Sequence, residues 1–452
     1  MTSGAIVIGV VQGLIIGLLA VGLVLTYKTN KFLNLAHAQF GALAALFMVK
    51  LVVDEGWNWW AAALVSIPIG SLLAIATYRL LVRRLLARTK SSAVLLLGSI
   101  AAVQLLSGVA ILPFFRPSTN ALVDSGGFPS PFEAKVSVGG VILYGESILI
   151  LIGAPVVIAG LVLLLRFTTL GKMVRAVAAN EDEASLCGIS VNRVSTQIWG
   201  ITGALSAVSA ILVFRSSGGF GGGGPSSLGV QLLLLTLGAA ALGAFQSIPL
   251  ALAGGLVLGI VQQATLAVTS SGGDALLVVF LVILVIVFAR GRFIAAAFSN
   301  STSTVQDQPP FQLPAVLADN LLIRYRLLAV SLAAGFVALL VPLLPFLRTD
   351  GDRFLLIIVL VFALTSVSLT VLLGWAGQIS LGHVAVLGGG AFIAARMVER
   401  KMSLPLVLLV SGLAGMVLVV VVGLPALRIR GLTLAVTTLG LAVVAPQWLY
   451  FQ

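Results

Sequence analysis

Apolar runs of about 20 residues recur along the whole chain, and they set the strongest limit on its fold. A helix of that length crosses the hydrocarbon core of a bilayer, whereas a membrane β-barrel is built from short alternating strands. Only 9% of the 452 residues are charged, while soluble domains carry roughly 25%. The sequence therefore predicts an all-α polytopic membrane protein.

The apolar runs fall into two groups. About nine lie in a first module, residues 1–292, and about five in a second module, residues 327–452. Residues 293–326 between them are polar, rich in Ser and Thr and interrupted by prolines, which is typical of a cytoplasmic linker. The predicted membrane segments are 4–25, 36–53, 60–82, 93–113, 146–166, 194–214, 229–246, 250–268, 275–289, 327–347, 354–373, 379–396, 404–424 and 432–451.

Glycines mark two regions among these segments. The region 229–268 is broken by glycines and by Pro249, so it holds either two full helices or re-entrant half-helices. Gly13 and Gly17 form a GxxxG pattern, which we interpret as a helix-packing surface.

Basic residues predict the orientation of the helices. Arg79, Arg83, Arg84, Arg88 and Lys90 lie in one short connection, which the positive-inside rule assigns to the cytoplasm. Counting outward from there places the N-terminus and the loop 114–145 outside and the loop 166–193 inside. Because the net charge of +12 is confined to such connections and forms no basic face with interleaved aromatics, we expect no nucleic-acid partner.

The only two histidines lie in similar stretches, NLAHAQFGAL at 34–43 and SLGHVAVLGG at 380–389. His37 and His383 are 346 residues apart, and each begins a predicted helix that leaves the cytoplasm. The repeat predicts two related modules with the same orientation in the membrane.

Two interpretations compete for each histidine. A histidine in a membrane helix needs a polar partner, so it either lines a solute path or ties its helix to the preceding turn by a hydrogen bond. Since no acidic neighbour is available for proton relay, the structural interpretation is favoured.

The cytoplasmic segment 169–194 carries apolar residues spaced among charged ones, which suggests short interfacial helices, and an ordinary solvated loop is an equal alternative. Glu181, Asp182 and Glu183 are suited to the start of a helix. The single cysteine, Cys187, is interpreted as a small packing residue.

Signs of catalysis are missing from the sequence. It has no GxxxxGK[ST] phosphate-binding motif, no cluster of metal ligands and no recognisable Ser, His and acid set. We therefore expect a protein that is not an enzyme and that uses no cofactor or metal.

Several stretches resemble the permease subunits of branched-chain amino acid ABC importers. In the first module these are TYKTNKFLNLAHAQFGALAA, GKMVRAVAANEDEASLCGISVNRV, which resembles the family's coupling loop, and AALGAFQSIPLALAGGLVLG. In the second, LLGWAGQISLGHVAVLGGGAFIAA and LRIRGLTLAVTTLG are similar to the companion subunit. The chain thus looks like a fusion of two permease subunits. The second is expected to be incomplete at its C-terminus, because its coupling loop would begin at about residue 515.

The resemblance implies a permease in a bacterial-type inner membrane, in contact with lipid and importing branched-chain amino acids. Its implied partners are two cytoplasmic ATPase subunits and an extracytoplasmic substrate-binding protein. The coupling loop would contain Gly171, Arg175, Glu181, Asp182, Ala184, Gly188 and Ile189. The substrate path, where the halves meet, would include Asn34, His37, Gln39, Gln378, Ser380 and His383.

Other functions remain open at this stage. Permeases that resemble this one also carry urea, short amides and other amino acids. A secondary transporter or channel would need ionisable residues inside its helices, and the predicted segments contain almost none beyond the two histidines. An assembly scaffold without transport would leave the twin histidine motifs unexplained.

Overall fold

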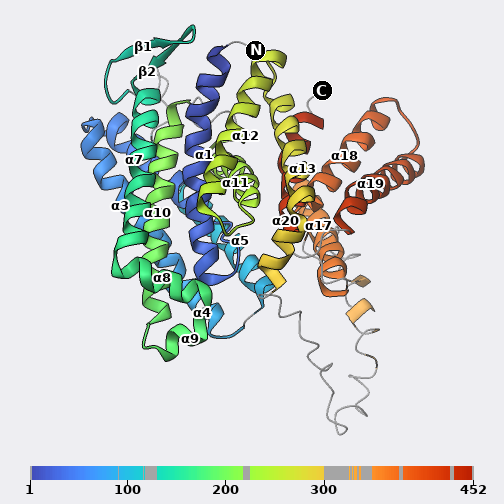
Figure 1. The fold of residues 1–452 in the computed structure, drawn as a ribbon. Coiled ribbons are helices and arrows are strands. Elements are labelled where there is room, and N and C mark those ends of the chain that lie inside the picture. The colour runs from blue at the N-terminus through green and yellow to red at the C-terminus, as the bar shows by residue number, and fades with distance from the viewer. Residues whose placement is uncertain are drawn as a thin grey trace.

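Long helices lie side by side along most of the chain (Figure 1). The computed structural model describes residues 3–89, 91–115, 130–216, 224–299, 349–375, 380–427 and 432–449, with a few single positions between them. Among the described residues, eight helices are long and apolar enough to cross a membrane. The prediction of an all-α polytopic membrane protein is confirmed, with one small strand pair added.

The helices of the first module follow the predicted apolar runs. They are α1 Ser3–Asn30, α2 His37–Val49, α3 Trp59–Thr77, α4 Arg83–Leu86, α5 Ser92–Val109, α7 Gly145–Phe167, α8 Thr169–Ala179, α9 Glu181–Leu186, α10 Val191–Ser216, α11 Gly224–Leu242, α12 Ile248–Thr269 and α13 Gly272–Ser299. Two π-helical turns, η1 Lys50–Asp54 and η2 Tyr78–Val82, extend α2 and α3.

In the second module the helices are α17 Asp350–Thr370, α18 His383–Glu399, α19 Leu404–Leu427 and α20 Leu432–Val444, with π-helical turns η5 Val371–Trp375 and η6 Ala445–Leu449. They begin in the same order and at nearly the same spacing as α1, α2, α3 and α5. The parallel arrangement of the modules stays a prediction. Most of the predicted segment 327–347 and of the linker 293–326 lies outside the described residues, and α13 continues into the first part of that linker.

Part of the predicted outside loop, residues 114–145, forms a β-hairpin that was not predicted. Strands β1 Lys135–Val138 and β2 Val141–Tyr144 pair antiparallel, and Gly139 and Gly140 form the turn with φ of +60° and +82°. Two glycines with positive φ suit a two-residue hairpin turn. The hairpin lies beside the start of α1 (Figure 1), where the Ser3 hydroxyl donates to the Gly139 carbonyl over 2.7 Å.

Glycines allow α1 and α12 to touch backbone to backbone. A Cβ atom added at Gly255 would lie 2.3 Å from the Gly17 nitrogen, and one at Gly259 would lie 2.4 Å from the Gly13 nitrogen. This confirms the interpretation of Gly13 and Gly17 as a packing surface. The region 229–268 forms two separate helices, α11 and α12, and Ser247 caps α12 just ahead of Pro249.

The two modules meet where α20 and η6 pack against α11 and α13. A Cβ atom at Gly440 of α20 would lie 2.5 Å from the ring of Phe280 in α13, so these helices are in close contact. The Trp448 indole in η6 donates to the Asp274 carboxylate at the start of α13 over 2.9 Å. These contacts join parts of the chain that are far apart in sequence.

Candidate functional site

The first histidine motif lies at a break between two helices. α1 ends at Asn30 and α2 begins at His37, and residues 32–36 between them are all buried. The His37 Nε2 atom donates to the Leu19 carbonyl over 3.1 Å. Leu19 lies about 16 Å back from Asn30 along α1 at 1.5 Å per residue. The break therefore carries the chain from the end of α1 back toward the middle of that helix.

Hydroxyl groups of neighbouring helices hold this break. The Leu35 amide donates to the Ser99 hydroxyl over 3.3 Å. Ser206 of α10 donates to the His37 carbonyl over 2.7 Å and accepts from the Gly41 amide over 3.0 Å. Irregular backbone at membrane depth is tolerated where protein buries and satisfies it, and these bonds meet that requirement.

Within the described residues, two buried side-chain atoms of this motif have no hydrogen-bond partner: Asn34 Nδ2 and His37 Nδ1. Asn34 uses its other atom, Oδ1, to accept from the Ala36 amide over 3.1 Å. Gln39 donates from Nε2 to the Ser107 hydroxyl over 3.3 Å. His37 thus makes the structural hydrogen bond that the sequence favoured, while the motif keeps one donor and one acceptor free.

The second motif repeats this arrangement with different atoms. His383 begins α18, and its Nε2 atom lies 3.0 Å from the Ser368 hydroxyl of α17. The Leu381 amide donates to the Thr438 hydroxyl of α20 over 3.0 Å, while the Ser380 hydroxyl accepts from Gly382 over 3.4 Å. Gln378 lies outside the described residues.

Both motifs adjoin one extended buried cluster, which also includes residues of α11 and α13. Leu33, Leu35 and Ala38 belong to one buried cluster, and Leu381 packs against that same cluster. The two motifs are therefore connected through this cluster, and their position along a substrate path stays a prediction.

The predicted coupling segment forms two short helices, α8 and α9, which confirms the helical alternative, while their place at the membrane interface stays a prediction. Thr168 caps α8 by accepting from the Gly171 amide over 3.2 Å. Asn180 caps α9 by accepting from the amides of Asp182 and Glu183 over 3.0 and 3.3 Å. Sequence reasoning missed Asn180, although an Asn directly before acidic residues is a known helix-start signal.

Several of the predicted coupling residues stabilise the conformation of this segment. Gly171 touches the Leu165 carbonyl so closely that a Cβ atom there would lie 2.0 Å from it, and the Arg175 guanidinium donates to the same carbonyl. Ala184 is buried against Val177 and Val194. Charged Glu181 and Asp182 are exposed.

A tight turn ends α9. The Ile189 amide donates to the Ala184 carbonyl over 3.0 Å, and Gly188 has φ of +82°, which favours glycine. Cys187, the last residue before this turn, is exposed, so its interpretation as a packing residue is wrong. The turn places it on the surface because the apolar face of α9 is supplied by Ala184 instead.

Hydrogen bonds tie the coupling segment to the break after α1. Lys31 Nζ donates to the Ala178 carbonyl of α8 over 2.8 Å. Asn30 donates to the Ser195 hydroxyl of α10 over 3.2 Å and accepts from the Trp199 indole over 3.0 Å. Burial and then the neighbouring Lys28 lower the pKa of Lys31, while Glu181 raises it. Lys31 therefore links α8 of the predicted coupling segment directly to the break after α1.

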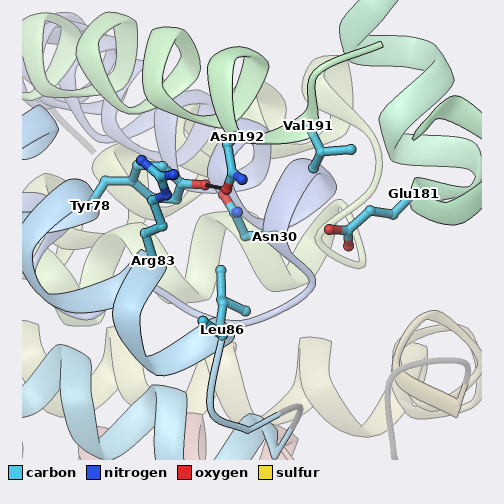
Figure 2. Close-up of a pocket in the computed structure, with 8 residues that line it drawn as sticks. Asn30, Tyr78, Arg83, Leu86, Glu181, Val191 and Asn192 are labelled. Atoms are coloured by element: carbon cyan, nitrogen blue, oxygen red, sulfur yellow. Dashed lines mark hydrogen bonds between the residues drawn. The ribbon is translucent and has the colours of Figure 1, made fainter. Parts of the chain in front are cut away.

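A cavity of about 330 Å³ lies beside this hydrogen bond (Figure 2). It is bordered by the end of α1, the turn η2, α4, α9 and the start of α10. Its polar wall includes the Tyr78 hydroxyl, which donates to Asn192 Oδ1 over 3.3 Å. The residues that line it are Asn30, Tyr78, Arg83, Leu86, Ala87, Glu181, Val191 and Asn192. Of these, only Glu181 was a predicted site residue.

Comparison with known proteins places these features in a family. LivH of Escherichia coli K12, a high-affinity branched-chain amino acid transport system permease protein, is 29% identical over 278 residues, covering 58% of this chain and 85% of LivH. BraD of Pseudomonas aeruginosa, of the same description, is 26% identical over 266 residues, covering 56% and 83%. A probable LivH of Methanocaldococcus jannaschii is 28% identical over 286 residues, covering 62% and 86%. No solved structure matches the chain.

One family model matches the chain in two separate segments, residues 5–289 and 352–452. The first segment runs from within α1 to within α13 and includes the first histidine motif and α8–α9, and the second runs from within α17 through α20 and includes the second motif. The two matches together cover most of the sequence. The chain therefore belongs to the family of permease components of branched-chain amino acid transport systems.

Proposed function

We propose that this chain forms the translocation path of an ATP-driven importer for branched-chain amino acids and supplies both permease halves. Separate cytoplasmic ATPase subunits hydrolyse ATP, and an extracytoplasmic binding protein delivers the amino acid. Family membership supports the class of protein. The names of the relatives support the substrate.

One observation supports the coupling route more than any other: the 2.8 Å hydrogen bond from Lys31 to the Ala178 carbonyl. α8 and α9 form the contact for an ATPase subunit. A displacement of these helices pulls on Lys31 and hence on the break that ends at His37. The unpaired atoms of Asn34 and His37 lie in that break and supply polar groups to the path.

The electrostatics of the helices favour this mechanism over ion-coupled transport. A secondary transporter needs ionisable side chains inside its helices to bind the driving ion. His37 is buried, yet its Nε2 atom already donates to a backbone carbonyl. The driving force is then supplied from outside the chain.

Uptake of radiolabelled leucine tests the proposal. The full chain is reconstituted with its ATPases and binding protein in liposomes, with and without ATP. We expect leucine uptake only when both ATP and the ATPases are present. ATP-dependent uptake of urea or a short amide without leucine uptake would keep the class and replace the substrate, whereas uptake without the ATPases would refute the importer.

Variants of the coupling segment test its role separately. Ala184 is buried, so Ala184→Arg displaces α9 from the helix bundle, and we expect it to abolish uptake and transport-coupled ATP hydrolysis. Lys172→Ala changes an exposed residue of α8 and serves as the matched control. Normal coupled hydrolysis in Ala184→Arg would show that the ATPases act elsewhere.

A further inference from the structure

Apolar, amide and charged side chains line the cavity at the cytoplasmic ends of the helices. Leu86, Ala87 and Val191 supply apolar surface, and Asn30 and Asn192 supply amides. Arg83 and Glu181 add one positive and one negative charge. A volume of about 330 Å³ is at the small end of ligand pockets, which suits a solute of amino acid size.

The two charges stand apart from each other. Figure 2 shows Arg83 and Glu181 on opposite sides of the cavity, with Asn30 and Asn192 between them. Arg83 belongs to α4 and Glu181 to α9, so the two come from different parts of the chain. Neither has an ion-pair partner among the described residues, in contrast to Arg353, which pairs with Asp350.

A cavity that offers one positive group, one negative group and apolar surface suits a small solute that carries both charges and an apolar part. An α-amino acid carries a carboxylate and an ammonium group on one carbon and its side chain on the same atom. Arg binds carboxylates with a planar pair of donors, and Glu accepts from ammonium groups. Leu86 and Val191 supply an apolar surface for an aliphatic side chain.

We propose that this cavity is a cytoplasmic binding site for a free aliphatic amino acid, with its carboxylate on Arg83 and its ammonium group on Glu181. The inference rests on the proposed importer, whose product would accumulate on this side. A bound amino acid would bridge α4 to α9 and so stabilise the present position of the coupling segment. Because transport requires that segment to move, the product would slow its own import.

Preloaded proteoliposomes test this feedback. The initial rate of ATP-dependent leucine uptake is measured with and without millimolar leucine inside the vesicles. We expect a several-fold lower rate in loaded vesicles. In Arg83→Gln the loaded and empty vesicles should give the same rate, with uptake by the empty vesicles unchanged. Arg84→Gln, beside Arg83 on α4 but outside the cavity lining, is the matched control and should keep the inhibition.

Equal inhibition of the wild-type chain and Arg83→Gln would overturn the proposal, since the product would then act at the transport path. Failure of the importer itself gives a different result, namely no ATP-dependent uptake into empty vesicles.

Binding to the chain in phosphatidylglycerol nanodiscs tests the site without transport, and such discs contain no zwitterionic lipid headgroup. Calorimetry with leucine, leucinamide and N-acetyl-leucine separates the two charges. We expect leucine to bind and the other two to bind at least about tenfold more weakly, a difference of 1.4 kcal/mol. Glu181→Gln should weaken leucine and leave N-acetyl-leucine unchanged. Equal affinities for all three, or no leucine binding, would refute the site.

Discussion

The chain forms the same kinds of hydrogen bond just before His37 and just before His383, in different surroundings. At each place, the leucine two residues before the histidine donates its amide to a hydroxyl of a later helix, Ser99 or Thr438. Each histidine then bonds the preceding helix through Nε2. The first uses a backbone carbonyl, and the second uses the hydroxyl of Ser368.

The neighbours of the histidines explain this difference. Gly22 lies 346 residues before Ser368, the same offset as between the histidines, and a Cβ atom at Gly22 would lie 2.8 Å from His37 Nε2. Glycine thus lets the ring reach the α1 backbone. Moreover, α1 is largely buried by α10 and α12, whereas no described residue of α17 is buried. The break before His383 therefore forms through local hydrogen bonds of hydroxyl groups and the histidine, although α17 lacks the packing that surrounds α1.

The largest expected effect on stability comes from disrupting the packing of α1 against α12. In Gly255→Val the new side chain would overlap Gly17, because a Cβ atom there already lies 2.3 Å from its nitrogen. We expect a loss of about 3 kcal/mol or more of stability, measured as a lower melting temperature in detergent. Gly412→Val in α19, where nothing lies within 4 Å, should change the melting temperature little. Equal shifts would contradict the tight α1–α12 contact.

The next effect comes from removing each histidine. His37 is fully buried, so His37→Ala leaves a cavity and removes the hydrogen bond to the Leu19 carbonyl, and we expect a loss of about 2–4 kcal/mol. His383 is more exposed, and His383→Ala should cost about 1 kcal/mol. Thermal unfolding of both variants measures the difference. A larger loss for His383→Ala would reverse the comparison.

Exchanging the neighbours of the histidines sharpens the comparison. Gly22→Ser forces the His37 ring away from Leu19 and should cost about 1–2 kcal/mol. Ser368→Gly removes the partner of His383 and should cost about 1 kcal/mol. In a double-mutant cycle, Ser368→Gly and His383→Ala should be non-additive by at least about 0.5 kcal/mol. Additive losses would show that this hydrogen bond contributes nothing.

The smallest effect on stability, but a specific one on coupling, is expected at Lys31. The aligned residue of the second repeat is Gly377, so only the first break has this lysine. Lys31→Met removes the bond to the Ala178 carbonyl, and we expect less leucine imported per ATP hydrolysed. Lys28→Met, one turn earlier on α1, is the control and should keep the wild-type ratio. An unchanged ratio in Lys31→Met would mean that the coupling segment acts through other contacts.

The helices were predictable because about 20 apolar residues leave few alternatives in a membrane. The coupling helices were one of two alternatives that the mixed apolar and charged pattern left open. The β-hairpin was missed, although its glycine pair between Val138 and Val141 is a hairpin signal. Composition had pointed only to an outside loop.

The contacts of the candidate site were harder to predict. Lys31 and Ala178 are 147 residues apart, and Ala178 contributes a backbone carbonyl, which leaves no mark in the sequence. The same holds for the Leu19 carbonyl that accepts from His37. Pattern reasoning found the side chains that carry the motifs, whereas their backbone partners depend on how distant helices pack.

The exposed Cys187 at the end of α9 gives the coupling segment a natural reporter. It is the one cysteine in the chain, so a maleimide spin label or fluorophore would attach at a single position without any engineered thiol. The motion of α9 during ATP turnover can then be recorded as a spectral change in the unmodified sequence.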